Sequence, residues 1–152
     1  PEGVGKPMIF FSRHPKIDHP RVVAAIVAAE RKTSGEIRVL LARHPAPDPV
    51  AAAQKHFERL GMTRTEHRNG VLIFLAPRSR TFAVIGDTAV HEKCGDAFWR
   101  ELTAAMTEHF KRGDFTAGLV HGIEHAGARL AEHFPHAPGD GNEMPDKIDE
   151  AD

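Results

Sequence analysis

Three carboxylates stand at points where the chain is expected to turn between elements. Asp87 follows an apolar run and Gly86, Asp114 lies in a Gly-Asp-Phe corner, and Glu36 begins an apolar run. In α/β folds ligands bind beyond the carboxyl ends of strands, and carboxylates brought together repel unless a cation or a proton joins them. Ca²⁺ and Mg²⁺ take such oxygen ligands. The alternative, which spacing alone favours, is that Asp87 and Asp114 cap the helices that follow them.

Arginines form a second candidate set. Arg68, Arg78 and Arg80 lie in two loops at strand ends, and we expect these loops to adjoin each other. Guanidinium groups gathered there could hold a phosphate, another anion or an acidic partner. A solvated loop surface is the simpler interpretation.

Histidine and cysteine suggest less chemistry. His121 and His125 are four residues apart on a predicted helix, so they share a face and could bind zinc. No H-E-x-x-H motif accompanies them, which favours surface histidines. Cys94 is the single cysteine, so an internal disulfide is excluded and a half-buried structural thiol is expected.

The common catalytic signatures are missing from the sequence. None of its three serines lies in a G-x-S-x-G elbow. It contains neither a phosphate-binding G-x-x-x-x-G-K-[ST] loop nor a G-x-G-x-x-G turn after a strand. We therefore predict no catalytic residue.

Composition describes one domain with an acidic end. The chain has 152 residues, 41% of them hydrophobic and 27% charged, as in ordinary globular domains. Residues 138–152 hold six acids against one base, a charge of −5, which leaves +4 on the rest because the whole chain carries −1. That charge is too small for a nucleic-acid interface. No apolar run approaches the roughly 18 residues of a membrane span. A cytoplasmic location is expected by default, although the chain begins with Pro1 and its natural N-terminus is left open.

Hydrophobic periodicity predicts the elements that position these residues. Strands are expected over 36–42, 71–76 and 81–85, the last two forming a hairpin. Helices are expected from Pro20 to Ser34, from Pro49 to Gly61, over 89–93, from Asp96 to Gly113, and over 116–134. The order predicts an α/β fold, a sheet between helices. We expect one domain over residues 1–137 and an acidic Pro/Gly-containing tail over 138–152.

Five segments together resemble one known family. They are AAERKTSGEIRV (28–39), LGMTRT (60–65), RNGVLIFLA (68–76), FAVIGD (82–87) and GDF (113–115). In this order they resemble the TPM domain, a family once classed as of unknown function and named for a thylakoid lumen protein, a photosystem repair protein and a nematode receptor modulator. The resemblance covers about residues 15–135.

The resemblance implies both a fold and a function. The fold would be an αβα sandwich, here a mixed sheet with a central β-hairpin and helices on both faces. Family members bind divalent cations through loop carboxylates, which by motif are Asp87, Asp114 and Glu36 here. The implied function is a non-catalytic cation-binding accessory or interaction domain, with calcium as the first cation and magnesium as the second. Its partner would be a protein, in the setting of membrane-protein assembly or repair.

The alternative function is a metal-dependent acid phosphatase, because a plant member of the family has been described as one. In that case Asp87 and Asp114 would hold the cation and Arg68 would orient the phosphate of a phosphomonoester.

Overall fold

A five-stranded mixed sheet forms the centre of the protein. The structure is a computed structural model that describes residues 2–7, 14–136 and 148–151. The strand order is β1-β4-β3-β2-β5. β2 is parallel to β3 and to β5, whereas β4 is antiparallel to β3 and to β1. The strands are β1 (Glu2–Pro7), β2 (Glu36–Ala42), β3 (Gly70–Ala76), β4 (Thr81–Gly86) and β5 (Ile148–Ala151).

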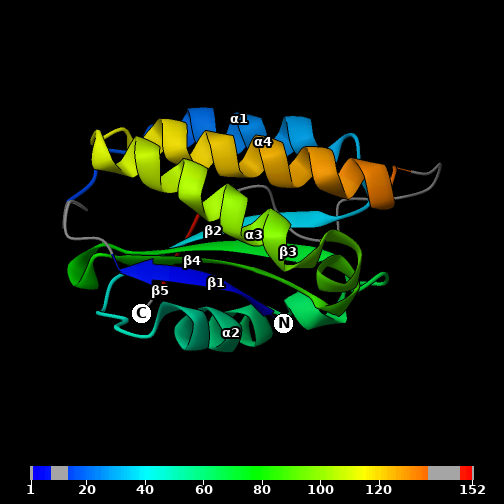
Figure 1. The fold of residues 1–152 in the computed structure, drawn as a ribbon, viewed down its shortest axis with the longest axis horizontal. Helices are drawn as coiled ribbons and strands as arrows, with labels where there is room; N and C mark the ends of the chain where they lie inside the picture. The colour runs from blue at the N-terminus through cyan, green and yellow to red at the C-terminus, as the bar shows by residue number, and fades with distance from the viewer. Residues whose placement is uncertain (1, 8–13, 137–147, 152) are drawn as a thin grey trace.

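Helices cover both faces of this sheet (Figure 1). Three helices pack together on one face and α2 lies alone on the other. The helices are α1 (His19–Glu30), α2 (Pro49–Arg59), α3 (Thr88–Lys111) and α4 (Phe115–His133), and two 3-10 turns, η1 (Met62–Arg64) and η2 (Pro77–Ser79), complete the elements. The predicted α/β sandwich with a central β3–β4 hairpin is therefore confirmed.

Apolar residues fill both layers of this sandwich. One core cluster joins a face of the sheet to α1, α3 and α4, and a second joins the opposite face to α2. Every residue of β3 and β4 is buried, as expected of central strands covered on both faces. These unbroken apolar runs explain why periodicity found the central strands.

Helix boundaries follow from local capping chemistry. Asp18, Asp48, Asp87 and Asp114 each cap a helix, and each side chain accepts a hydrogen bond from a backbone N–H of the first turn. Gly95, at φ 77°, interrupts α3, which accounts for the two separate helical segments that the sequence predicts there.

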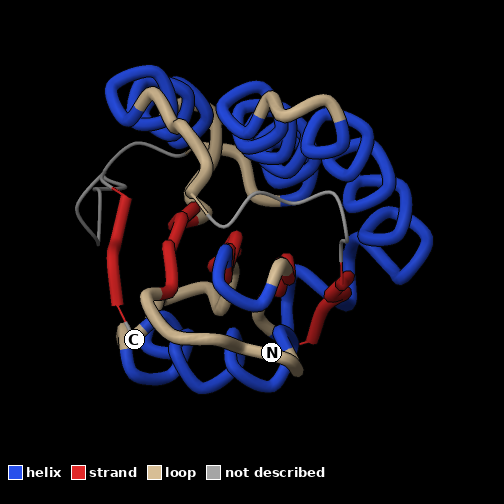
Figure 2. Tube along the Cα trace, turned by 90° about the vertical axis from the view of Figure 1, so that its left-hand side faces the viewer, coloured by secondary structure: helices blue, strands red, loops and turns tan. Residues whose placement is uncertain are grey.

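The two edge strands were not predicted. β1 reads EGVGKP and β5 reads IDEA, and such short glycine-rich or acidic segments lack the alternation that identifies a strand. β5 pairs with β2 at one edge of the sheet, opposite β1 (Figure 2). The end of the expected tail therefore belongs to the sheet, while residues 138–147 of that tail lie outside the described ranges.

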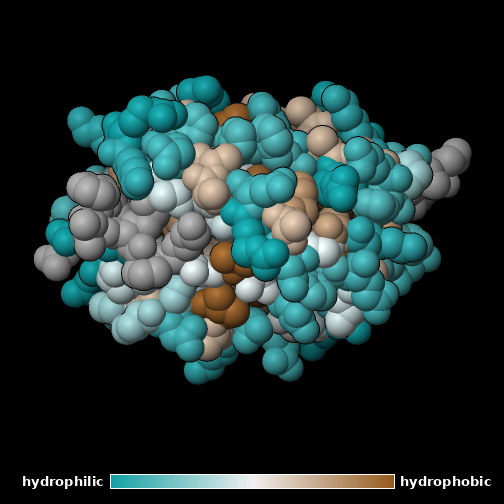
Figure 3. Space-filling view, in the orientation of Figure 1, coloured by the Kyte–Doolittle hydropathy of each residue, from teal (hydrophilic) through white to brown (hydrophobic). Residues whose placement is uncertain are grey.

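The surface is mainly hydrophilic on the side shown in Figure 3, with a small hydrophobic area at the level of β1. Within the described ranges, no helix is both long and apolar enough to cross a lipid bilayer.

Candidate functional site

Polar residues gather at the end of the sheet where β4 finishes and β2 and β3 begin. Glu36 pairs with Gly70 in the parallel ladder, and the Asp87 N–H donates to the Gly70 carbonyl at 2.9 Å. Two of the three predicted carboxylates therefore flank Gly70. We call this end, formed by Ser34, Glu36, Arg68, Asn69 and Asp87, the Asp87 junction.

Asp87 is a fully buried carboxylate with a dense set of donors. Its Oδ1 accepts from the Thr88 N–H at 2.7 Å and from Arg68 Nη2 at 2.9 Å, while Oδ2 accepts from Arg68 Nε at 2.7 Å. The predicted cap is present, and a bidentate guanidinium is added to it. Such fork-shaped pairs are among the strongest ionic hydrogen bonds in proteins.

Arg68 adopts an unusual backbone conformation to reach Asp87. Its φ is 53°, in the left-handed region that residues other than glycine rarely adopt, and its carbonyl accepts from the Ala89 N–H at 3.3 Å. Its side chain is 46% exposed, whereas the Asp87 side chain that it binds is fully buried. The hydrogen bonds to the Asp87 carboxylate, together with its charge, raise the pKa of Arg68 above its ordinary value. Left-handed non-glycine residues often mark functional positions.

Asn69 adds an oxygen donor to the Asp87 junction. It is fully buried, and its Nδ2 donates to Ser34 Oγ at 3.1 Å. Its Oδ1 is buried and accepts no hydrogen bond from the residues that the structure describes. Glu36 is also buried, with 2% of its surface exposed. Asn69 was not among the predicted site residues, because no local signal in the sequence distinguishes its amide as a buried group.

Asp114 lies far from the other two carboxylates. It is exposed and caps α4, where its Oδ1 accepts from the Ala117 N–H at 3.0 Å. Asp87 caps the start of α3 and Asp114 follows its end, so both parts of this helix, before and after the kink at Gly95, lie between them. The uninterrupted part after Gly95, residues 96–111, alone extends roughly 24 Å at about 1.5 Å per residue. One cation cannot bind both.

The predicted arginine set is divided in the same way. Arg68 precedes β3, whereas Arg78 and Arg80 follow it, and seven extended residues span roughly 23 Å. Arg78 Nη1 donates to the Arg43 carbonyl at 3.5 Å, and Arg80 has a left-handed φ of 56° in the hairpin turn. The two loops do not adjoin, contrary to expectation, because they lie at opposite ends of one strand.

Metal-ligating side chains do not converge elsewhere either. Across the part of the chain that the structure describes, no three His, Cys, Asp or Glu residues form a group able to hold a metal ion. His121 and His125 stack with ring centroids 3.8 Å apart, and His109 lies 5.3 Å from His121. Burial and the neighbouring imidazoles lower the pKa of His121. Cys94 is buried.

A buried ion pair between β2 and β5, at one edge of the sheet, was not predicted from the sequence. Arg38 Nε and Nη2 both lie near Asp149 Oδ2, at 2.8 and 2.6 Å, and the side chains are 5% and 10% exposed. A basic residue inside the apolar run 37–41 was the available signal. Its partner, 111 positions away, could not be assigned locally.

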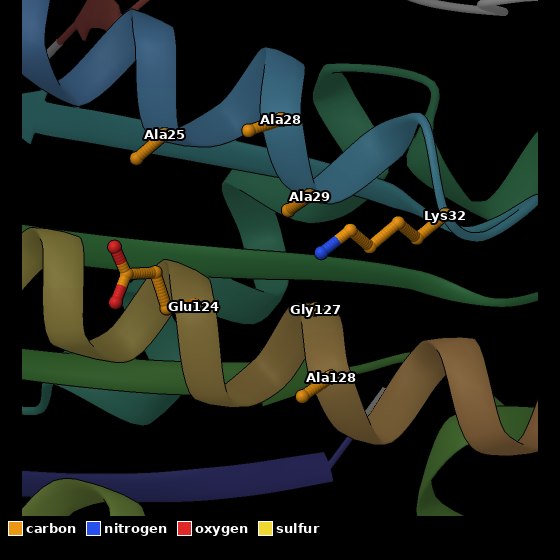
Figure 4. A pocket seen from close by; sticks show the side chains of 7 residues that line it. All are labelled: Ala25, Ala28, Ala29, Lys32, Glu124, Gly127 and Ala128. Atoms are coloured by element: carbon orange, nitrogen blue, oxygen red, sulfur yellow. The ribbon is translucent and has the colours of Figure 1, made fainter.

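Cavities in the described part of the molecule lie away from the Asp87 junction. A groove of about 350 Å³ lies between α1 and α4, with a floor of alanines and Gly127, and Lys32 and Glu124 on its sides (Figure 4). A smaller cavity of about 190 Å³ lies against α2 and is lined in part by His44, Lys55 and His56. The small residues of the first groove reflect the close approach of two helices, since a Cβ on Gly127 would lie 2.7 Å from Ala29 Cβ.

Comparison with known proteins agrees with this architecture. Residues 17–129 match the family model described as the TPM domain. A solved structure, the NMR structure of the BA42 protein from the psychrophilic bacterium Bizionia argentinensis, is similar with 40% sequence identity and a TM-score of 0.80. The similarity covers 87% of this chain and 91% of that one. Comparison with curated proteins gives no match.

Proposed function

The chain belongs to the TPM domain family, and from that premise we propose that it is a non-catalytic accessory domain that binds a divalent cation, calcium first and magnesium second. The observation that carries the proposal is the Asp87 carboxylate, fully buried at the end of the sheet and paired with a half-exposed guanidinium. Its partner would be a protein concerned with membrane-protein assembly or repair.

The donors at the Asp87 junction fit calcium in kind. Carboxylates and amide oxygens are the ligands that hard cations take, and Asp87, Glu36 and Asn69 supply both types. The buried Asn69 Oδ1, which accepts no hydrogen bond from described residues, supports this assignment. Asp114 lies outside the proposed site because α3 separates it from Asp87.

Arg68 occupies the position of a cation at Asp87. Its two hydrogen bonds already neutralise the carboxylate, so cation binding requires Arg68 to release Asp87. The partial exposure of the Arg68 side chain favours such an exchange, because the freed guanidinium can be hydrated without rearrangement of the core. Arg68 is therefore a competitor for the proposed cation.

A non-catalytic role is supported by the surroundings of the hydroxyl groups. Among the described serines, Ser34 accepts from Asn69, and Ser79 contacts the Ala46 N–H and Thr81. Neither is hydrogen-bonded to a histidine, so neither shows the pairing that activates a serine nucleophile. The phosphatase remains the second candidate, with Arg68 as the group that would orient a phosphate.

Calcium titration of four proteins tests the proposal, with calorimetry and backbone amide shifts as readouts. We expect saturable binding by the wild type, tighter binding by Arg68→Gln because its competitor is gone, and no binding by Asp87→Asn. Asp114→Asn is the matched control, since Asp114 caps a helix as Asp87 does but lies far away, and its affinity should equal that of the wild type. Absence of saturable binding in both the wild type and Arg68→Gln would refute the cation site.

The same proteins separate the two candidate functions. A phosphomonoester assay at acidic pH in the presence of calcium should show no turnover by the wild type. Turnover that is lost in a folded Asp87→Asn protein, and retained in Asp114→Asn, would establish the phosphatase in place of the accessory domain.

A further inference from the structure

The smaller cavity, next to α2, lies where two central parallel strands end. Its volume is about 190 Å³, and it is lined by Ala42, the last residue of β2, and by Phe74 of β3. β2 and β3 run parallel, so their carboxyl ends lie at the same end of the sheet. Open α/β sheets bind ligands beyond the carboxyl ends of their strands. The Asp87 junction lies at the other end of β2 and β3, where both strands begin.

The lining of this cavity combines small apolar groups with basic side chains. The apolar residues are Ala42, Pro45, Ala46, Ala52 and Phe74, and the basic residues are His44, Lys55 and His56. Among the described residues that line the cavity, none is acidic. Lys55 is exposed and forms no ion pair with a residue in the described ranges. Its ammonium group can therefore meet an anion in the cavity.

His56 is the buried polar residue of this lining. It is 9% exposed, and its ring stacks on Phe74 with the ring centroids 5.7 Å apart. Arg59 Nε and Nη2 lie 3.2 and 2.9 Å from His56 Nδ1. A guanidinium can only donate hydrogen bonds, so Nδ1 is the acceptor and the ring proton is on Nε2. Arg59 therefore fixes His56 as an Nε2–H donor in the lining of the cavity.

The loop after β2, which lines part of the cavity, is fastened to the β3–β4 hairpin. The Ala46 N–H donates to Ser79 Oγ at 2.9 Å, and the Ala46 carbonyl accepts from Thr81 Oγ1 at 2.7 Å. Arg78 Nη1 donates to the Arg43 carbonyl at 3.5 Å. These contacts hold the loop in one conformation, so the cavity does not have to be built when a ligand arrives.

Positive charge exceeds negative charge around the cavity. Arg43 and Arg78 lie at the loop, and Arg59 lies behind His56. Of the nearby acids, Glu150 faces Arg43 at 3.4 Å on the exposed side, and the Asp48 carboxylate accepts the hydrogen bond that caps α2. With Lys55 in the lining itself, the surroundings favour an anion with two charges over a monocarboxylate.

The volume limits the ligand to a small group. Since each water occupies roughly 30 Å³ in the liquid, the cavity has room for about six water molecules. We propose that this cavity binds a phosphate group, either the free ion or the head of a small phosphorylated molecule. Lys55 supplies the counter-charge and the His56 Nε2–H donates a hydrogen bond. The Asp87 junction takes no part, so the inference does not depend on cation binding there.

Titration of the full-length protein with inorganic phosphate tests this site, with chloride used to keep the ionic strength constant. We expect saturable shifts of the backbone amides in residues 42–46 and 52–56. The imidazole ¹⁵N shifts of His56 should report a proton on Nε2 and should move as phosphate binds. Acetate, a monocarboxylate, should bind more weakly than phosphate.

Phenyl phosphate distinguishes the two sources of the phosphate group. Tighter binding of this ester than of inorganic phosphate identifies a phosphorylated small molecule as the ligand, because its ring can contact the apolar lining. Binding that is equal or weaker identifies the free ion.

Matched lysine variants assign the binding to this cavity. Lys55→Gln should weaken phosphate binding about tenfold, the factor expected of one ionic hydrogen bond, and Lys55→Arg should retain most of it. Lys32→Gln is the control, because Lys32 is also an exposed lysine at a cavity but lies on the opposite face of the sheet (Figure 1). Its affinity should equal that of the wild type. Circular dichroism verifies that each variant is folded.

A further variant separates this inference from the proposed cation site. Asp87→Asn should bind phosphate as the wild type does, whether or not the wild type binds calcium. Phosphate-induced shifts confined to residues 68–69 and 87–88 would place the anion at Arg68 and overturn the inference. So would a folded Lys55→Gln protein with wild-type affinity, equal binding of acetate and phosphate, or the absence of saturable shifts in residues 42–46 and 52–56.

Discussion

Replacement of Asp87 by alanine tests whether this carboxylate fastens the end of the sheet to α3. The substitution removes a helix cap, worth about 1 kcal/mol, and two ionic hydrogen bonds from Arg68. Such bonds contribute roughly 1.5–3 kcal/mol each when buried. We take the lower value, about 1.5 kcal/mol, for the two Arg68 hydrogen bonds together. The reason is that the Arg68 side chain is 46% exposed and is rehydrated once it is released.

The expected loss for Asp87→Ala is therefore about 3 kcal/mol of unfolding free energy, or a fall of about 10 °C in the midpoint for a domain of this size. Urea unfolding followed by circular dichroism measures it, with an unchanged m-value as the sign that the unfolding transition is the same. Asp114→Ala is the control: it removes an exposed cap without an arginine, so its cost should be only about 1 kcal/mol. Equal losses in the two variants would refute the reasoning that the Arg68 pair stabilises the fold.

Three further residues give predictions of different kinds. Gly118→Ala should lower the free energy of unfolding by about 1–3 kcal/mol in urea, since the added Cβ would overlap the Phe110 ring. A neutral result would mean that the Phe110 ring moves aside at little cost. The pKa of His121 lies below its ordinary 6.5 in the folded protein. The unfolded chain therefore binds more protons below that pH, and stability should fall as the pH drops through 6.5. His121→Gln should flatten this pH dependence of the unfolding free energy. Burial raises the pKa of the Cys94 thiol above its ordinary 9.0, so stability should fall as the pH rises above about 9. Iodoacetamide at pH 8 should also label the thiol of the native protein far more slowly than that of the protein in urea. Rapid native labelling would contradict the burial of that thiol.

Local sequence chemistry accounts for most of the architecture. The bounds of β2 are those that its alternating apolar residues predict, and the two predicted aspartate caps, Asp87 and Asp114, are present. These features depend on residues within a few positions of one another, so periodicity and capping rules suffice. β1 and β5 escaped prediction because they exist only through pairing with β4 and β2, far away in the chain.

The candidate site shows the same division. The sequence determined that Asp87 ends a buried strand and begins a helix, and the family motif indicated it as a cation ligand. Tertiary structure decided its neighbours. Parallel pairing of β2 with β3 brought Glu36 to the same end of the sheet, and the left-handed turn at Arg68 delivered a guanidinium to the carboxylate.

Tertiary structure also decided which charged residues lie close together, which the sequence motifs could not show. Asp87 and Asp114 carry equivalent Gly-Asp signatures, yet a long helix holds them at opposite ends of the molecule. Arg38 and Asp149 are 111 positions apart, yet the edge of the sheet brings them into contact. Spacing along the sequence reports which residues share an element, because helices and strands are local. Which carboxylate meets which cation is set by packing between elements, and that information exists only in the tertiary structure.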